Sequence, residues 1–362
     1  MTTTTSRPQT SGLRAALVKL AERVTTPLLP ADYLDVIDPL LSGSQLRGRI
    51  VGIHPETRDA VTVEIKPGSG WRPHLPGQYL RLGIEVDGVR QWRSYSITSR
   101  PGDRCVTITV KAVSDGVVSN HLVRRATVGT IVHLEQPAGD FTLPRSNSPL
   151  KALFLTAGSG ITPVMGMLRS LQLTEGSDIV VVHSAPRSDD VIFAGELRML
   201  SQRNHIRLVE IHTGCDGRLE PTRLSDLVRD LDQRQTWACG PTDMLDAIER
   251  HWAAAGLSAQ LHIERFRPTL VTTGEGGAVT FSATGTTVDD DGSRSLLDAG
   301  ESAGVLMPSG CRMGICFGCV APLRRGAVRD LRTGALTTAN DGDGVVVQTC
   351  VSAAAGDCDI DL

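Results

Sequence analysis

Residues 308–319 read Pro-Ser-Gly-Cys-Arg-Met-Gly-Ile-Cys-Phe-Gly-Cys, which places Cys311, Cys316 and Cys319 in a C-x4-C-x2-C array. A fourth cysteine, Cys350, follows within Val-Val-Gln-Thr-Cys-Val. This is the ligand spacing of a plant-type [2Fe–2S] cluster, which needs four thiolates. The glycines let the backbone curl and aim N–H groups at sulfur. A zinc site is the alternative, although zinc loops usually pair two C-x2-C knuckles and this stretch has one.

Length and composition restrict the remaining choices. A chain of 362 residues with a net charge of −3 is expected to hold roughly two to four globular domains. No basic field indicates a nucleic-acid partner. The other cysteines show no disulfide framework, which favours a reducing cytoplasm; they are Cys105, Cys215, Cys239 and Cys358.

The N-terminal residues 1–44 differ from the rest of the chain. They lack the basic and apolar regions of a signal peptide, and no apolar run in the chain approaches the ~20 residues that span a bilayer. Residues 13–24 place apolar side chains on one face at helical spacing, flanked by basic residues. We expect a helical extension that packs on the body of the protein or docks on a partner or a membrane surface.

The pattern of the chain then changes twice. Residues 45–147 alternate apolar and polar residues over short segments, which predicts an antiparallel barrel or sandwich. Residues 148–267 alternate continuous apolar runs with helical stretches, which predicts an α/β domain with a mainly parallel sheet. Residues 268–277 are rich in Pro, Thr and Gly and indicate a linker, and residues 278–362 hold the cysteine array.

Two segments of the barrel region suit a flat, phosphorylated ligand. Residues 93–99 read Arg-Ser-Tyr-Ser-Ile-Thr-Ser, and residues 116–119 read Gly-Val-Val-Ser. Arginine binds a diphosphate through a charge-assisted fork, and Tyr95 offers an aromatic face for a ring system. Taken alone, the first segment is typical of an ordinary strand.

A glycine loop follows the first apolar run of the α/β region. Residues 156–163 read Thr-Ala-Gly-Ser-Gly-Ile-Thr-Pro and open a helix, where backbone N–H groups can approach a phosphate. The loop is not G-x-G-x-x-G, so the dinucleotide fingerprint of Rossmann domains is absent. A second turn, Cys239-Gly240-Pro241, follows a later strand.

Together these segments resemble the ferredoxin–NADP reductase superfamily over roughly residues 45–362. Arg93, Tyr95, Ser96 and Ser99 match its R-x-Y-S-x-x-S flavin motif, and residues 76–79 match the strand before it. Residues 116–119 are similar to its diphosphate loop, and residues 158–163 and 239–241 to its two nucleotide signatures. The order of the motifs resembles that of reductase components of oxygenases and desaturases.

The resemblance implies a multidomain NAD(P)H-dependent oxidoreductase. It implies an antiparallel β-barrel flavin domain, a parallel-sheet α/β nucleotide domain and an α+β ferredoxin domain of the β-grasp type, which bind FAD, NADPH and a [2Fe–2S] cluster. The choice of FAD over FMN rests on the analogy between the flavin motifs. The implied metal ligands are Cys311, Cys316, Cys319 and Cys350.

The resemblance also implies which residues touch the cofactors. Tyr95 and Ser96 would flank the isoalloxazine and Cys239 would lie near hydride transfer, so these three are the expected catalytic residues, although Cys239 also suits a buried core position. The expected cofactor-binding residues are Arg93, Tyr95, Ser96, Ser99, Gly116, Val118, Ser119, Thr156, Gly158, Gly160, Thr162, Pro163, Ser184, Arg187, Gly240 and Pro241.

Two details stay open. Ser184 and Arg187 follow the second buried strand, where they could bind a 2′-phosphate, which favours NADPH; Asp189 and Asp190 follow soon after, so NADH is the alternative. Phe266 either covers the flavin, as an aromatic does in the family, or packs at the edge of its domain.

Such a reductase would convert the two-electron chemistry of a nicotinamide into one-electron steps. The N-terminal extension resembles that of actinobacterial reductases serving membrane acyl-CoA desaturases, so we expect a membrane fatty-acyl desaturase as the electron acceptor. A soluble or ring-hydroxylating oxygenase is the alternative. A stand-alone NAD(P)H diaphorase or oxidase needs no partner protein, and a redox-sensing iron–sulfur protein would need no intact flavin motif.

Overall fold

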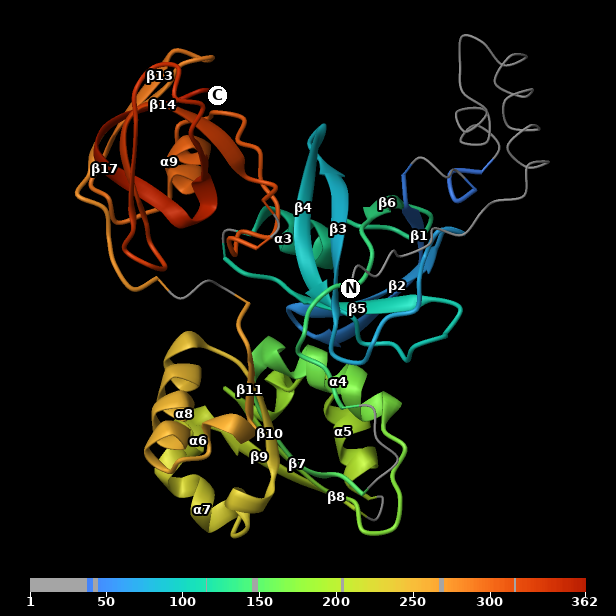
Figure 1. Cartoon of the computed structure of the whole chain (residues 1–362). Helices are drawn as coiled ribbons and strands as arrows, with labels where there is room; N and C mark the ends of the chain where they lie inside the picture. The colour runs from blue at the N-terminus through green and yellow to red at the C-terminus, as the bar shows by residue number, and fades with distance from the viewer. Residues whose placement is uncertain are drawn as a thin grey trace, which may run out of the picture.

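The computed structural model describes residues 38–41, 45–114, 116–144, 149–202, 205–266, 270–315 and 317–362. These residues form three bodies, each with its own sheet, which the chain enters one after another (Figure 1). The helix expected over residues 13–24 lies outside the described residues, as does Cys316. Within the described part of the chain, no helix is long and apolar enough to cross a membrane.

The first body is an antiparallel sheet of six strands in the order β4-β3-β6-β1-β2-β5. A bridge between Ile97 and Ile108 joins the end of β4 to β5, so the sheet closes on itself. Leu80, Leu82 and Ile84 point into its core at alternate positions. The elements are β1 (Arg47–Thr57), β2 (Ala60–Pro67), β3 (Tyr79–Val86), β4 (Val89–Ser96), β5 (Val106–Lys111), α3 (Val117–Arg124) and β6 (Ile131–Leu134).

The second body is a parallel sheet of five strands in the order β11-β10-β7-β8-β9. Helices cover both faces, α4 and α5 on one and α7 and α8 on the other (Figure 1). The elements are β7 (Lys151–Ala157), α4 (Ile161–Ser170), β8 (Asp178–Ala185), α5 (Ala194–Ser201), β9 (Ile206–His212), α6 (Thr213–Asp216), α7 (Leu224–Leu227), β10 (Gln235–Cys239), α8 (Thr242–Ala254) and β11 (Leu261–Glu264).

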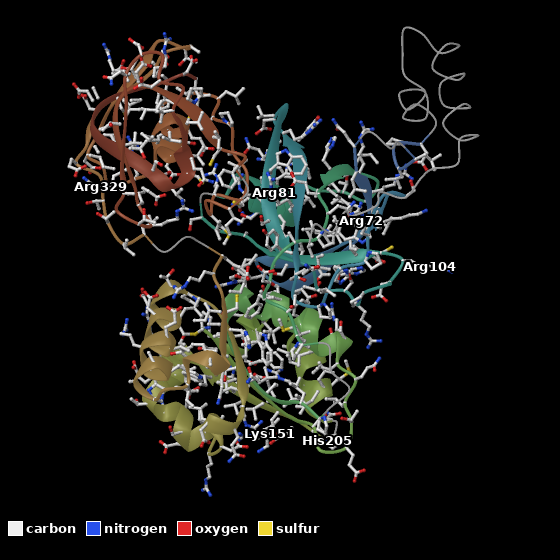
Figure 2. All side chains as sticks on the ribbon, in the orientation of Figure 1. Arg72, Arg81, Arg104, Lys151, His205 and Arg329 are labelled. Carbon is white, nitrogen blue, oxygen red and sulfur yellow. The ribbon has the colours of Figure 1, made fainter. Side chains whose placement is uncertain are left out.

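The direction of the five strands shows which edge of this sheet can bind a ligand. Lys151, the first residue of β7, lies at the edge away from the barrel (Figure 2). Because all five strands are parallel, their carboxyl ends therefore face the barrel. Ligands of open α/β sheets bind at this edge.

The third body is a mixed sheet in the order β13-β12-β17-β14-β15, with β16 paired to β14. Strands β12 and β17 are parallel and the other pairs are antiparallel. The side chain of Ser295 accepts the N–H of Asp298 and so caps the only helix described in this body. The elements are β12 (Gly277–Phe281), β13 (Thr286–Asp290), α9 (Leu296–Ser302), β14 (Val320–Asp330), β15 (Leu336–Ala339), β16 (Val346–Gln348) and β17 (Ser352–Ile360).

The expected three-part fold class is confirmed, with local differences. Residues 116–119, expected as a loop, include the first turn of α3. The helix α7 is short, because Val228 already has extended backbone, and a 3-10 turn follows at Leu231–Gln233. The domain boundaries proposed from composition stay predictions.

Candidate functional site

Two neighbouring cavities lie where the three bodies meet. The first, of about 800 Å³, is bounded by the barrel, the glycine loop before α4 and the cysteine loop of the third body. The second, of about 810 Å³, lies over the carboxyl ends of the parallel strands. Lys111, Ser159 and Phe266 line both cavities, so the two spaces adjoin.

The flavin motif forms one wall of the first cavity. Arg93, Tyr95 and Ser96 line it from the end of β4. Burial raises the pKa of Tyr95 far above its usual range, so the phenol stays neutral and can donate a hydrogen bond. Arg93 donates to the carbonyl oxygen of Trp92 at 2.7 Å, which holds its guanidinium at the cavity.

The start of α3 forms the opposite part of the wall. Gly116, Val118 and Ser119 line the cavity there. The hydroxyl of Ser119 donates to the carbonyl oxygen of Gly116 at 3.1 Å and accepts the N–H of Val113 at 3.3 Å. A Cβ at Gly116 would lie 2.3 Å from that hydroxyl, so this tight turn excludes larger residues. The positive end of α3 therefore faces a space that can hold an anion.

The glycine loop places the start of α4 between the cavities. Gly158, Gly160 and Ser184 line the second cavity, and Thr162 lines the first. A Cβ at Gly160 would lie 2.0 Å from the carbonyl oxygen of Cys239, so glycine is required by close packing of two strand ends. Gly240 and Pro241 complete this wall of the second cavity.

Five predicted residues lie away from both walls: Ser99, Thr156, Pro163, Arg187 and Cys239. Thr156 is fully buried in β7, where its hydroxyl shares a hydrogen bond of 2.8 Å with Nδ1 of His183. Arg187 is exposed and lies 3.6 Å from Asp190. Cys239 is fully buried, and burial raises the pKa of its thiol well above the ordinary value. The catalytic role of Cys239 stays a prediction, as do the roles of the other four.

Sequence reasoning missed three polar residues of the walls. Glu264, at the end of β11, lines the first cavity. Its pKa is raised to about 7, mainly by burial and in addition by the negative charge of the nearby Asp140. Arg218 lines the second cavity, and Lys111 lines both. The carboxyl-end rule for parallel sheets would have directed attention to Glu264 and to the loop of Arg218.

The cysteine loop has the features of an iron–sulfur site. The described cysteines Cys311, Cys319 and Cys350 are buried, and the Sγ atoms of the last two are 3.1 Å apart. The N–H of Met313 donates to the Sγ of Cys311 at 3.3 Å. Among the described residues no three metal-ligating side chains converge on one point, and Cys316 is not described. The three described thiols are donors of the type that an iron–sulfur cluster requires.

The curl of this loop has a backbone cause. Arg312, Gly314 and Phe317 adopt left-handed φ angles of 57°, 71° and 56°. A Cβ at Gly314 would lie 2.3 Å from a guanidinium nitrogen of Arg332, which donates to the carbonyl oxygen of Gly314 at 3.0 Å. These left-handed angles, two of them at non-glycine residues, set the course of the backbone between Cys311 and Cys319.

The cysteine loop also reaches the first cavity. Cys311, Arg312 and Met313 line it opposite the flavin motif. In Figure 1 the loop that follows α9 approaches α3 and β4 of the barrel. The cavity suited to a flavin thus contains a candidate cluster ligand in its wall.

Three family descriptions match the chain in this order. "Oxidoreductase FAD-binding domain" matches residues 73–143, "Oxidoreductase NAD-binding domain" matches residues 154–250, and "2Fe-2S iron-sulfur cluster binding domain" matches residues 279–355. These matches correspond to the three bodies of the fold.

Relatives with similar sequences span most of the chain. An NADPH oxidoreductase of Mycobacterium tuberculosis is 50% identical over 355 residues, which cover 96% of this chain and 92% of that protein. A glycine betaine monooxygenase reductase subunit of Chromohalobacter salexigens is 30% identical over 311 residues, which cover 76% of this chain and 84% of that protein.

A solved structure has the same arrangement of domains. Phthalate dioxygenase reductase superposes with a TM-score of 0.61 at 23% identity, over 88% of this chain and 98% of that protein. At this level of identity the likeness establishes the fold.

Proposed function

The chain belongs to the ferredoxin-reductase superfamily, with a C-terminal [2Fe–2S] domain after its FAD-binding and NAD-binding domains, and from this premise we propose that it supplies single electrons from NADPH to a protein acceptor. It is an oxidoreductase that carries electrons from NAD(P)H through FAD to the cluster. The nucleotide preference, the contact residues and the acceptor belong to the proposal.

One observation carries the proposal. The cavity lined by Tyr95 and Ser96 adjoins the nucleotide cavity on one side and is bounded by Cys311 on the other. When bound, the nicotinamide supplies a hydride, the flavin accepts two electrons and releases them singly, and the cluster carries one. The protein contributes the close placement of the three groups.

Each group of residues has a proposed task. Arg93 and the start of α3 hold the flavin phosphates, and Tyr95 and Ser96 orient the ring. The N–H groups around Gly158 and Gly160 bind the nucleotide diphosphate. Cys311, Cys316, Cys319 and Cys350 hold the irons. Glu264, which lines the first cavity as Thr162 does, has a pKa of about 7 and would hold a proton below that pH where nicotinamide and flavin would meet.

The preference for NADPH is supported by the second cavity. Ser184 and Arg218 line it, and Arg218 pairs with Asp243 only at 3.9 Å, which leaves the guanidinium available to a 2′-phosphate. Arg187, the arginine expected from the sequence, does not line this cavity. The relative with 50% identity carries NADPH in its name.

We propose a membrane fatty-acyl desaturase as the acceptor, with an oxygenase as the second candidate. The alignment with the mycobacterial relative covers 96% of the chain and so includes much of the N-terminal extension on which the first candidate rests. The second is favoured by the name of the glycine betaine monooxygenase reductase subunit. Electron delivery to purified candidates separates them, because only a true acceptor turns over its substrate with NADPH and this protein.

Anaerobic stopped-flow mixing with NADPH tests the order of carriers. We expect Cys316→Ser to lose the cluster and the reduction of protein acceptors, while flavin bleaching keeps its rate. Cys358→Ala, which changes a buried cysteine of the same domain outside the loop, should keep both activities. Reduction of protein acceptors by Cys316→Ser at the wild-type rate would refute the order.

A further inference from the structure

Two arginines from different domains line the same cavity. Arg93 comes from β4 of the barrel, and Arg312 comes from the cysteine loop of the third body. Burial, and then the nearby charge of Arg312, lowers the pKa of Arg93. Two like charges in a partly enclosed space repel each other more strongly than they would in water. The carboxylate of Glu301 offsets part of this repulsion, and an anion bound in the cavity would offset more of it.

The position of Arg312 is fixed. It follows Cys311 directly, and its left-handed φ of 57° sets the direction in which its side chain leaves the loop. Its terminal nitrogens form ion pairs with Glu301 and, at 3.5 Å, with Asp298. Its Nε is buried and has no hydrogen-bond partner among the described residues. A buried guanidinium N–H without an acceptor is costly, so an acceptor is expected in the cavity.

The cavity itself indicates the acceptor. At about 800 Å³ it has the size of a cofactor site, and the positive end of α3 lines it together with Arg93. Lys111 also lines the cavity, but its Nζ lies 2.6 and 2.7 Å from the two carboxylate oxygens of Asp59. Arg312 is paired with carboxylates as well, but its Nε takes part in neither ion pair, so Arg93 and Arg312 keep donors for a phosphate.

We propose that Arg312 is a flavin ligand supplied by the iron–sulfur domain, which binds the phosphate of the flavin together with Arg93. The inference rests on the proposed placement of the flavin in this cavity. Binding of flavin then draws the cysteine loop onto the barrel, and the two domains share one cofactor. Loss of this contact weakens both flavin binding and the docking of the cluster beside the flavin.

Flavin titration of the full-length protein, stripped of flavin but with its cluster intact, tests the proposal. Charge-assisted hydrogen bonds to phosphate are strong, so Arg312→Gln should raise the Kd for FAD and FMN by roughly 10- to 100-fold. Riboflavin lacks phosphate, and its Kd should be the same for Arg312→Gln and wild type. Arg324→Gln, an exposed position of the same domain paired with Asp341 at 4.0 Å, serves as the control.

The outcomes separate the inference from its premise. If Arg93→Gln leaves the Kd for FAD unchanged, the flavin does not occupy this cavity, and both statements fail. If Arg93→Gln weakens FAD binding and Arg312→Gln changes it less than twofold, only the inference is wrong. An equal loss for riboflavin would also overturn it, because the contact would then not involve phosphate.

A second variant keeps the test decisive if Arg312→Gln fails to load its cluster, which the visible spectrum reports. Glu301→Gln removes the carboxylate that competes with the phosphate for Arg312. The Kd for FAD should then fall, with no change for riboflavin. An unchanged or higher Kd for FAD in Glu301→Gln would in that case overturn the proposal.

Discussion

The guanidinium of Arg169, at the end of α4, donates a hydrogen bond of 2.7 Å to the carbonyl oxygen of Thr98, within the flavin motif. The same side chain pairs with both carboxylate oxygens of Glu196, at 2.8 and 2.6 Å. A Cβ at Gly166 would lie 2.4 Å from the carbonyl oxygen of Ile97, so α4 runs directly against the barrel. Because α4 begins at the nucleotide loop, this helix ties the nicotinamide site to the flavin site.

Replacing Arg169 by Gln should slow hydride transfer. A misplacement of about 1 Å can cost up to ~100-fold in rate, and we expect about a tenfold slower reduction of the flavin by NADPH. Arg169→Lys should recover part of the loss. Electron transfer from flavin to cluster should not change, since the side chain of Arg169 binds to the barrel and to α5.

Anaerobic stopped-flow absorbance measures both steps. Arg198→Gln is the matched control, because Arg198 forms a similar ion pair with Glu210 but lies exposed on α5. A variant that loses about 1–2 kcal/mol of stability yet keeps the hydride-transfer rate would show that Arg169 is only structural.

The glycine loop allows a sharper steric test. Gly160→Ala would bring a methyl group to 2.0 Å from the carbonyl oxygen of Cys239 if the wild-type backbone did not move. The loop must therefore shift, and we expect the Kd for NADP⁺ to rise at least tenfold, as measured by isothermal titration. Gly195→Ala, in α5 with open space around it, should bind normally and be more stable by about 0.5–1 kcal/mol. If Gly160→Ala binds NADP⁺ as tightly as the wild type, the assignment of this glycine loop to the nucleotide is wrong.

These residues show how far the sequence leads. A motif with a local backbone requirement, such as Gly116 beside Ser119, can be recognised from the sequence, because short-range geometry determines the residue. Gly160 is recognised by its motif, although the contact that requires glycine there is with the distant Cys239. Arg218 and Glu264 belong to no motif, and the rule that ligands bind at the carboxyl ends of parallel strands points to their segments without singling out either residue. In the sequence Arg312 is merely one residue of the cysteine array, and only the packing of two domains places it at the flavin cavity.

His183 predicts a dependence of stability on pH. The side chain is fully buried in β8, and burial lowers its pKa to about 4. The unfolded chain binds a proton below about pH 6.5, whereas the folded chain does not until about pH 4, so stability falls as the pH drops through this window. The loss should be on the order of 2–3 kcal/mol by pH 4.

Urea unfolding followed by tryptophan fluorescence at pH 7 and pH 4.5 measures this effect. His183→Asn should be less sensitive to the change of pH than the wild type. His205→Asn, at an exposed position of the same domain (Figure 2), should behave like the wild type. Equal pH sensitivity in His183→Asn and wild type would show that other groups cause the acid loss.

The nucleotide preference depends on which arginine meets the 2′-phosphate. Arg218→Gln should raise KM for NADPH by roughly 10- to 100-fold and leave KM for NADH nearly unchanged. Arg187→Gln removes the exposed arginine outside the cavity. It should change the ratio of the KM for NADPH to the KM for NADH less than threefold. Steady-state reduction of ferricyanide measures both. If Arg187→Gln raises the KM for NADPH more than Arg218→Gln does, Arg187 is the residue that binds the 2′-phosphate.

Glu264 predicts that stability and the rate of flavin reduction both fall as the pH rises. Its raised pKa of about 7 means that the folded protein keeps the carboxyl neutral where the unfolded chain, with an ordinary value of 4.5, is ionised. Stability is therefore lost as the pH rises from 4.5 through 7. Glu264→Gln should be more stable than the wild type at pH 8, and the difference should vanish at pH 4.

The Glu264 carboxyl should also affect the rate of flavin reduction. A carboxylate that forms above pH 7 opposes the negative charge that the flavin gains with the hydride, so wild-type flavin reduction should slow between pH 6 and 8.5 with a midpoint near 7. Glu264→Gln should show no such midpoint, and Glu175→Gln, at an exposed position, should keep it. Stability and rate are measured separately. If Glu264→Gln still shows the midpoint near pH 7 in the rate of flavin reduction, Glu264 has no role in hydride transfer, even where the substitution changes stability as expected.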